Sequence, residues 1–120
     1  MEPNIDKYAS GWSQRAESER AACIEREKTA RERLSALAQH LASRHGASRV
    51  SLIGSLARAT FRRDSDVDLL VWGLPENAAV RAAREASDLM GIPVDLLRAE
   101  DLRDDWLSYH ERHGRVLHER

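Results

Sequence analysis

The sequence predicts an α/β fold, in which a small mixed β-sheet is flanked by helices and carries a long helix at its N-terminal end. Residues 10–44 contain no proline and are rich in alanine and charged residues, which is typical of one continuous helix. From residue 47 onward, short apolar runs alternate with helical patterns, which is typical of a sheet covered by helices. A chain of 120 residues has room for one domain. We expect residues 1–46 to form a helical extension and residues 47–120 to form the globular unit.

The long helix has two different halves. Its apolar stripe is weak in the first half and strong in the second, and it comprises Ala16, Cys23, Ala30, Leu34, Leu37 and Leu41. The first half is a run of mixed charges, in which Glu27 and Arg31 are spaced to form an ion pair one turn apart. We therefore expect the second half to pack on the core. The first half either presents a solvated face or docks a partner chain, in which case the protein forms a homodimer or a hetero-oligomer.

The remaining elements follow from periodicity and from turn residues. The expected strands are residues 50–53, 67–72 and 92–97 with a final edge strand at 116–117, and the expected helices are residues 77–90 and 101–113. Gly46 and Gly91 are placed where helices end, and Asp101 is placed where the last helix begins. Spacing puts Trp106 and Tyr109 on the buried face of that last helix, beside Leu102.

Composition excludes several classes of protein. With 19 basic and 20 acidic residues, the chain lacks the broad cationic surface of a nonspecific nucleic-acid binder, and we expect no direct nucleic-acid binding. A single cysteine, Cys23, excludes an internal disulfide and a multi-cysteine zinc site. The absence of a long apolar run or a signal-peptide pattern leads us to expect a cytoplasmic protein that has no contact with membranes.

The chemically informative residues are three aspartates. Asp66 and Asp68 lie two residues apart at the start of an apolar strand, so their side chains point to the same face. Two neighbouring carboxylates are unfavourable in such a place unless they share a cation. Asp95 is a lone charge in a second apolar run, and it joins the pair if the two strands are neighbours. Three carboxylates can hold two Mg²⁺ or Mn²⁺ ions, the arrangement that supports in-line phosphoryl or nucleotidyl transfer.

A short segment upstream supplies residues suited to phosphate. Gly54 closes a strand and allows the backbone to approach a ligand closely. Ser55 then offers a hydroxyl at the start of a helical turn, and Arg58 adds a positive charge one turn later. The plainer alternatives are that Ser55 is a helix cap, that Asp95 is a salt-bridged structural acid, and that Asp66 and Asp68 cap a turn. His110 and His113, spaced three apart, are interpreted as surface or packing residues.

The block GSLARATFRRDSDVDLLV, with Gly54-Ser55, ten intervening residues and then Asp66-x-Asp68, resembles the minimal nucleotidyltransferases of the DNA polymerase β-like nucleotidyltransferase superfamily. The resemblance extends over residues 50–117 and includes Asp95. It implies that Gly54 and Ser55 seat a nucleoside triphosphate, that Asp66 and Asp68 bind Mg²⁺, and that Asp95 completes the second metal site and helps to activate the attacking hydroxyl. Two departures affect the nucleotide-side loop: Ala59 replaces a common glycine, and Phe61-Arg62-Arg63 is bulkier and more basic than usual.

The resemblance also implies an activity and a partner. Minimal nucleotidyltransferases of this kind are antitoxins that transfer AMP from ATP to a tyrosine of a HEPN-domain toxin. Two alternatives stay open. The chain could neutralise its partner by binding alone, as the projecting charged helix suggests, or it could modify a small molecule as antibiotic nucleotidyltransferases do.

Overall fold

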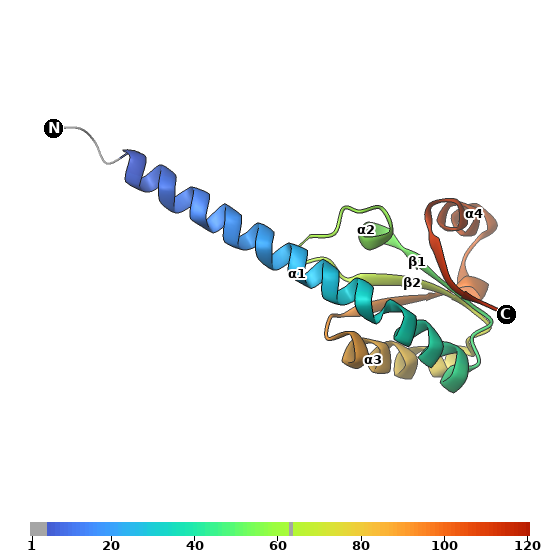
Figure 1. Ribbon diagram of the computed structural model, residues 1–120. Helices are drawn as coiled ribbons and strands as arrows, with labels where there is room; N and C mark the ends of the chain where they lie inside the picture. Colours follow the sequence, from blue (N-terminus) through green and yellow to red (C-terminus); the bar gives the residue numbers. More distant parts are fainter. Residues whose placement is uncertain (1–4, 63) are drawn as a thin grey trace.

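The structure is a computed structural model that describes residues 5–62 and 64–120, with side chains described from residue 14 onward. Residues 1–4 and Arg63 lie outside the described residues. Four strands form one sheet in the order β3-β2-β1-β4 (Figure 1). The elements are α1 (Ile5–His45), β1 (Arg49–Ile53), α2 (Gly54–Ala57), β2 (Val67–Trp72), η1 (Glu76–Ala78), α3 (Ala79–Met90), β3 (Val94–Arg98), η2 (Ala99–Asp101), α4 (Asp104–His113) and β4 (Arg115–Glu119).

Helix α1 has the two halves that its sequence predicts. Residues 14–22 are exposed, and this part of α1 projects away from the rest of the chain (Figure 1). From Ala30 onward the apolar stripe is buried, and the predicted Glu27–Arg31 ion pair forms at 2.9 Å. The helix ends where Gly46 adopts a positive φ of 74°, with the Ala47 amide donating to the carbonyl of Leu41 at 3.1 Å. In the part of the chain that the structure describes, none of the helices is both long and apolar enough to cross a bilayer.

The sheet is mixed, as predicted. Strand β1 runs antiparallel to both β2 and β4, whereas β2 and β3 are parallel. The parallel pair requires a crossover connection, which α3 provides. Gly91 ends α3 with a φ of 69°, and the amide of Val94 then donates to the hydroxyl of Ser87 at 2.9 Å, which fixes the start of β3 against the helix.

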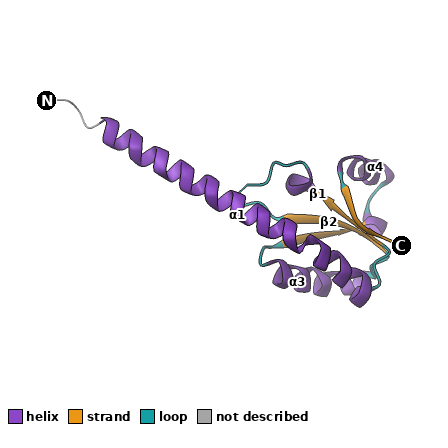
Figure 2. Cartoon of the chain, in the orientation of Figure 1, coloured by secondary structure: helices purple, strands orange, loops and turns teal. Residues whose placement is uncertain are grey.

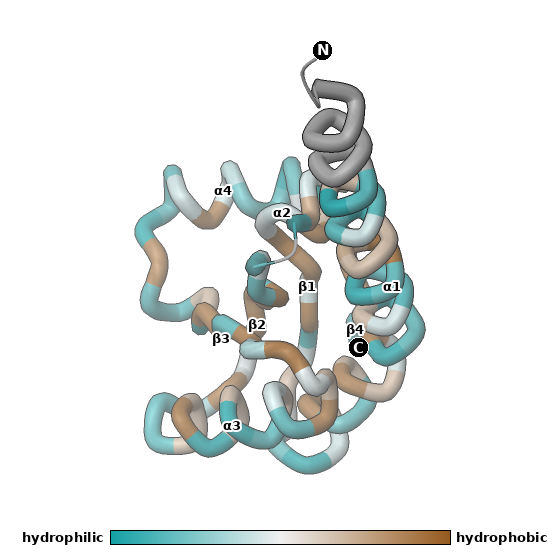
Figure 3. Tube along the Cα trace, turned by 90° about the vertical axis from the view of Figure 1, so that its left-hand side faces the viewer, coloured by the Kyte–Doolittle hydropathy of each residue, from teal (hydrophilic) through white to brown (hydrophobic). Residues whose placement is uncertain are grey.

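The two faces of the sheet are covered unequally (Figures 2 and 3). On one face α1 and α3 bury the main core. Its largest fully buried side chains are Leu37, Leu41, Leu52, Leu56, Leu69, Leu74 and Met90, together with Val50, Val67 and Val71. On the other face Ile53, Leu70 and Ala99 form a smaller cluster beneath Leu102 and Leu107. The beginnings of β2 and β3 stay open on this second face, where Asp66 and Asp95 are exposed.

The start of α4 differs from the expectation. Asp101 ends the short helix η2, and Arg103 occupies the position before α4, so Asp101 does not cap the helix. Leu102 therefore lies outside α4, and the helical phase starts again at Asp104. Trp106 and Tyr109 consequently do not share the buried face with Leu102, and they are 54% and 38% exposed. The prediction that they are buried is wrong, because it assumed that one continuous helix runs from Leu102 to Tyr109, whereas α4 begins at Asp104.

Candidate active site

The three aspartates gather on the open face of the sheet, where β2 and β3 begin. Asp68 and Asp95 are register partners on the two parallel strands, and Asp66 lies just before β2. Alternation along β2 puts Asp68 on the same face as Leu70, which belongs to the smaller cluster beneath α4. Asp66 and Asp95 are exposed, while Asp68 is partly buried. The sequence prediction depended on β2 and β3 being neighbours, and they are.

The electrostatics of Asp68 reflect this gathering. Burial raises the pKa of the Asp68 carboxyl above its ordinary value, and the charges of Asp95 and then Asp66 raise it further. Arg58 acts in the opposite direction and lowers the pKa of the same carboxyl. All four predicted charged residues therefore interact at one place. Oxygen ligands with a surplus of negative charge fit a hard divalent cation such as Mg²⁺.

The carboxylate oxygens of Asp66, Asp68 and Asp95 do not all come within 4.8 Å of one another. Like charges repel, and the two exposed side chains have room to turn away from Asp68. The backbone therefore places the three groups at one edge, and the side chains would still have to converge on a shared cation.

Gly54 is required by the close approach of the turn after β1 to Asp68. It has a φ of 74°, and a Cβ built on it would collide with the Asp68 carboxylate. Ile53 and Asp68 are register partners, so the turn follows directly beside the acid. Ser55 is the second residue of α2, and its hydroxyl has no hydrogen-bond partner among the residues that the structure describes, although its carbonyl accepts the Thr60 amide at 2.8 Å. Ser55 is therefore not a side-chain helix cap here, and its hydroxyl is free to meet a ligand.

Helix α1 holds α2 and the loop that leads from it to β2. The Arg26 guanidinium donates to the carbonyl of Ser65 at 3.1 Å, and that of Arg31 donates to the carbonyl of Leu56 at 3.0 Å. Phe61 is buried in the main core, and its carbonyl accepts a hydrogen bond from the Cys23 thiol at 3.3 Å. The bulky loop that departs from the family pattern is thus anchored to the long helix. Sequence reasoning missed this support because nothing local links the helix to the loop.

Ala59 has a positive φ of 58°, in the left-handed region that favours glycine. This conformation gives a physical reason for the glycine that is common at this place in the resembling family. The sequence therefore retains an alanine in a strained turn next to the predicted nucleotide side of the site.

Helix α4 adds a second wall that the sequence interpretation did not use. Tyr109, His110 and His113 line a small pocket of about 50 Å³ whose other wall is Ile53, Gly54 and Arg58. The Trp106 ring stacks on that of His110 with a centroid distance of 6.1 Å. The spacing of the two histidines was visible in the sequence, but only the packing of α4 beside β1 brings them to Gly54.

The comparisons with known proteins agree with this geometry. Residues 34–116 match the family model of the nucleotidyltransferase domain, and because the match covers more than half of the chain, the chain belongs to this family. A solved structure proposed to be a minimal nucleotidyltransferase is 34% identical, with a TM-score of 0.64 over 73% of this chain and 92% of that chain. The chain is a nucleotidyltransferase of the minimal type, with a polymerase β-like core and a long N-terminal helix.

More distant structures share the fold. A toxin–antitoxin crystallised with AMP-PNP is 20% identical, with a TM-score of 0.63 over 72% of this chain and 73% of that chain. A mutant of the toxin–antitoxin MntA-HpeT is 18% identical, with a TM-score of 0.54 over 62% of each chain. A comparison with curated protein sequences finds no match.

Proposed function

We propose that this chain is a Mg²⁺-dependent nucleotidyltransferase that transfers AMP from ATP to a tyrosine hydroxyl of a HEPN-domain toxin, and that it acts in the cytoplasm as the antitoxin. The observation that carries the proposal is the pairing of Asp68 with Asp95 across two parallel strands, with Asp66 and Gly54 beside them. The structural neighbours that are toxin–antitoxin complexes, one of them with AMP-PNP, support the choice of donor and partner.

Each residue has a role that follows from its position. Asp66 and Asp68 hold the divalent cations, and Asp95 completes the second metal site. When bound, Mg²⁺ neutralises the triphosphate and stabilises the departing pyrophosphate. Gly54 and the free hydroxyl of Ser55 receive the phosphates, because the turn after β1 lies against Asp68. Arg58 adds positive charge on the same side.

The transfer forms one bond and breaks another at the α-phosphorus of ATP. The acceptor hydroxyl oxygen bonds to this phosphorus as the bond to the bridging oxygen of pyrophosphate breaks. The hydroxyl proton passes to the carboxylate of Asp95, which is exposed and therefore accessible to an acceptor. AMP remains on the acceptor, and pyrophosphate leaves.

The decisive experiment measures the intact mass of a HEPN-domain partner after incubation with this chain, ATP and Mg²⁺. We expect a gain of one or more AMP units that disappears with EDTA and in the Asp66→Asn and Asp68→Asn variants. Asp64→Asn is the matched control, because Asp64 is an exposed acid just outside the site and its variant should retain transfer. An unchanged partner mass in a stable complex would refute transfer to that protein.

A second function is favoured by the exposed first half of α1. Residues 14–22 present a mixed-charge surface that makes no contribution to the core, which suits docking to another protein. In this case the chain neutralises its partner by contact alone. Full neutralisation by the triple variant of Asp66, Asp68 and Asp95 to Asn would favour binding over catalysis.

A further inference from the structure

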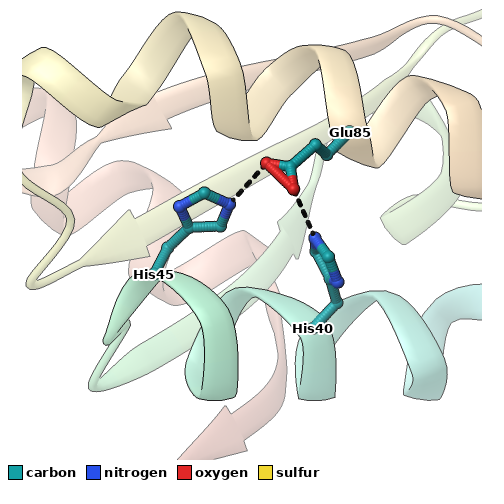
Figure 4. A group of neighbouring side chains, drawn as sticks. All are labelled: His40, His45 and Glu85. Carbon is teal, nitrogen blue, oxygen red and sulfur yellow. Dashed lines mark hydrogen bonds and ion pairs between the residues drawn. The ribbon is translucent and has the colours of Figure 1, made fainter.

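A cluster of two histidines and a glutamate lies away from the aspartates. His40 and His45 come from the last turns of α1, and both point at the Glu85 carboxylate on α3 (Figure 4). The Nε2 atom of His40 is 3.4 Å from one carboxylate oxygen, and that of His45 is 2.9 Å from the other. Within the described part of the chain, this is the one set of three His, Cys, Asp or Glu residues whose ligand atoms all lie within 4.8 Å of one another.

The donor set and its dimensions suit a transition metal. Two imidazole nitrogens and one carboxylate oxygen are a ligand set used for Zn²⁺, which leaves a fourth position open. Zinc–nitrogen and zinc–oxygen bonds of about 2.0–2.1 Å in a tetrahedron put neighbouring ligand atoms about 3.3 Å apart. The two nitrogens lie 3.4 and 2.9 Å from different oxygens of the Glu85 carboxylate, and one ligand atom from each residue lies within 4.8 Å of the others. Side-chain rotations would therefore have to bring one carboxylate oxygen and the two nitrogens to the tetrahedral spacing.

Burial leaves one of these nitrogens without a hydrogen bond. The Nε2 atom of His40 is inaccessible to solvent and makes no hydrogen bond among the described residues, although it lies 3.4 Å from a Glu85 carboxylate oxygen. The side chain of His45 is only 10% exposed. With both imidazoles protonated the three groups form ion pairs, whereas with neutral imidazoles a metal ion between them would give the His40 nitrogen the partner that it lacks.

The cluster also has an entry path. Glu85 and His45 line an open pocket of about 560 Å³, which is shared with Arg44, Asn77 and Arg81. An ion held by His40, His45 and Glu85 would therefore present its open position to this pocket. The two arginines make the pocket positive, so the fourth ligand should be an anion such as chloride or hydroxide.

The cluster is separate from the aspartates in position and in chemistry. His45 lies just before the beginning of β1, whereas Asp68 pairs with Ile53 at the end of that strand. A strand of five residues separates the two places by about 13 Å or more. Nitrogen ligands select a borderline metal, and the all-oxygen set of the aspartates selects Mg²⁺.

We propose that His40, His45 and Glu85 form a binding site for a divalent transition metal of the Zn²⁺ class, and that the bound ion fixes the end of α1 to α3. The ion would join two helices that cover the same face of the sheet. The site does not depend on the proposed nucleotidyl transfer, and its test needs no nucleotide or partner.

The test is a titration of the full chain with Zn²⁺ in competition with a chromophoric chelator, in chloride buffer and with excess Mg²⁺. We expect one equivalent to bind and Mg²⁺ not to displace it. The single variants His40→Gln, His45→Gln and Glu85→Gln should each lose at least about tenfold in affinity. His118→Gln, which alters a partly buried histidine outside the cluster, and Asp68→Asn should retain it.

Two further measurements separate a lost site from a lost fold. Far-UV circular dichroism should show the same helical content in every variant. Co²⁺ in place of Zn²⁺ should give the intense visible absorption of a four-coordinate site in the wild type and not in the cluster variants. The proposal is overturned if the wild type binds no Zn²⁺, if the cluster variants bind it as tightly as the wild type, or if Asp68→Asn removes it.

Discussion

Replacing Asp68 with asparagine should stabilise the fold while it removes the metal-binding chemistry. The pKa of the Asp68 carboxyl is raised by burial and by the charges of Asp95 and Asp66, so the ionised group opposes folding. Asparagine has nearly the same shape and carries no charge. The variant therefore relieves repulsion without opening a cavity in the sheet.

The size of the effect follows from the register. Asp68 and Asp95 face each other across neighbouring strands, which lie about 4.8 Å apart. Two unit charges at about 5 Å repel by about 3 kcal/mol at an effective dielectric constant of ~20 and by about 1 kcal/mol in bulk water. Because Asp95 is exposed and the attraction of Arg58 is also lost, we expect a gain near the lower figure. About 1 kcal/mol corresponds to about 3–5 °C in Tm for a domain of this size.

The effect should depend on pH with a definite sign. Because the pKa of Asp68 is raised in the folded state, the folded protein holds this proton more tightly than the unfolded chain does. The penalty in the wild type is fully present above the raised pKa, declines as the pH falls through that pKa, and is absent below the ordinary value of 3.8. The advantage of Asp68→Asn should therefore be greatest at neutral pH and vanish in acid.

Urea unfolding with and without Mg²⁺ measures both parts of this prediction. Without Mg²⁺ the variant should be more stable than the wild type, whereas Mg²⁺ should stabilise the wild type by about 2.7 kcal/mol at a hundred times its Kd and leave the variant unchanged. Asp64→Asn is the control, and it should behave as the wild type in both buffers. A destabilised Asp68→Asn would show that the carboxylate is a structural acid, and the assignment of the site would be wrong.

The remaining predictions concern the turn after β1 and its support. Ala59→Gly should raise the free energy of unfolding, measured in urea melts, by about 0.5–1 kcal/mol. The substitution removes the strain of an alanine in the left-handed region, and the greater backbone entropy of the unfolded chain offsets part of this gain. A loss of stability would contradict the strained turn. Gly54→Ala should lower the free energy of unfolding by about 1–2 kcal/mol because of its positive φ alone. It should also abolish Mg²⁺-dependent nucleotide binding, measured by calorimetry, because the added methyl group displaces Asp68. Nucleotide binding equal to that of the wild type would exclude the close approach of Gly54 to Asp68. Arg26→Gln should weaken nucleotide binding while helical content stays constant, because the carbonyl of Ser65 loses its donor; Arg20→Gln, in the exposed part of α1, should change neither.

The sequence predicted the parts of this fold that have a periodic or chemical signature. The mixed sheet, the helix stops at Gly46 and Gly91 and the packing of the second half of α1 all follow from local patterns, and they are confirmed. The pairing of Asp68 with Asp95 was predicted conditionally, since a lone charge in an apolar strand indicates a partner and not which strand supplies it.

What the sequence could not predict depends on contacts between distant segments. Trp106 was assigned to the core because its spacing from Leu102 is helical, and a break at the start of α4 put it on the surface. His40 and His45 are five residues apart, which is not a ligand spacing on one face of a helix. Only the packing of α3 against the end of α1 brings Glu85 between them.

The long helix connects the two chemically distinct ends of the sheet. Near its middle, Arg26 and Arg31 hold the carbonyls of the segment that separates Gly54 from the aspartates. At its end, His40 and His45 meet Glu85 on the helix that leads into β3, the strand that carries Asp95. A change in the seating of α1 would therefore reach both sides of the proposed nucleotide site. For this reason the second half of the helix is part of the framework that positions the proposed site, and not an appendage to it.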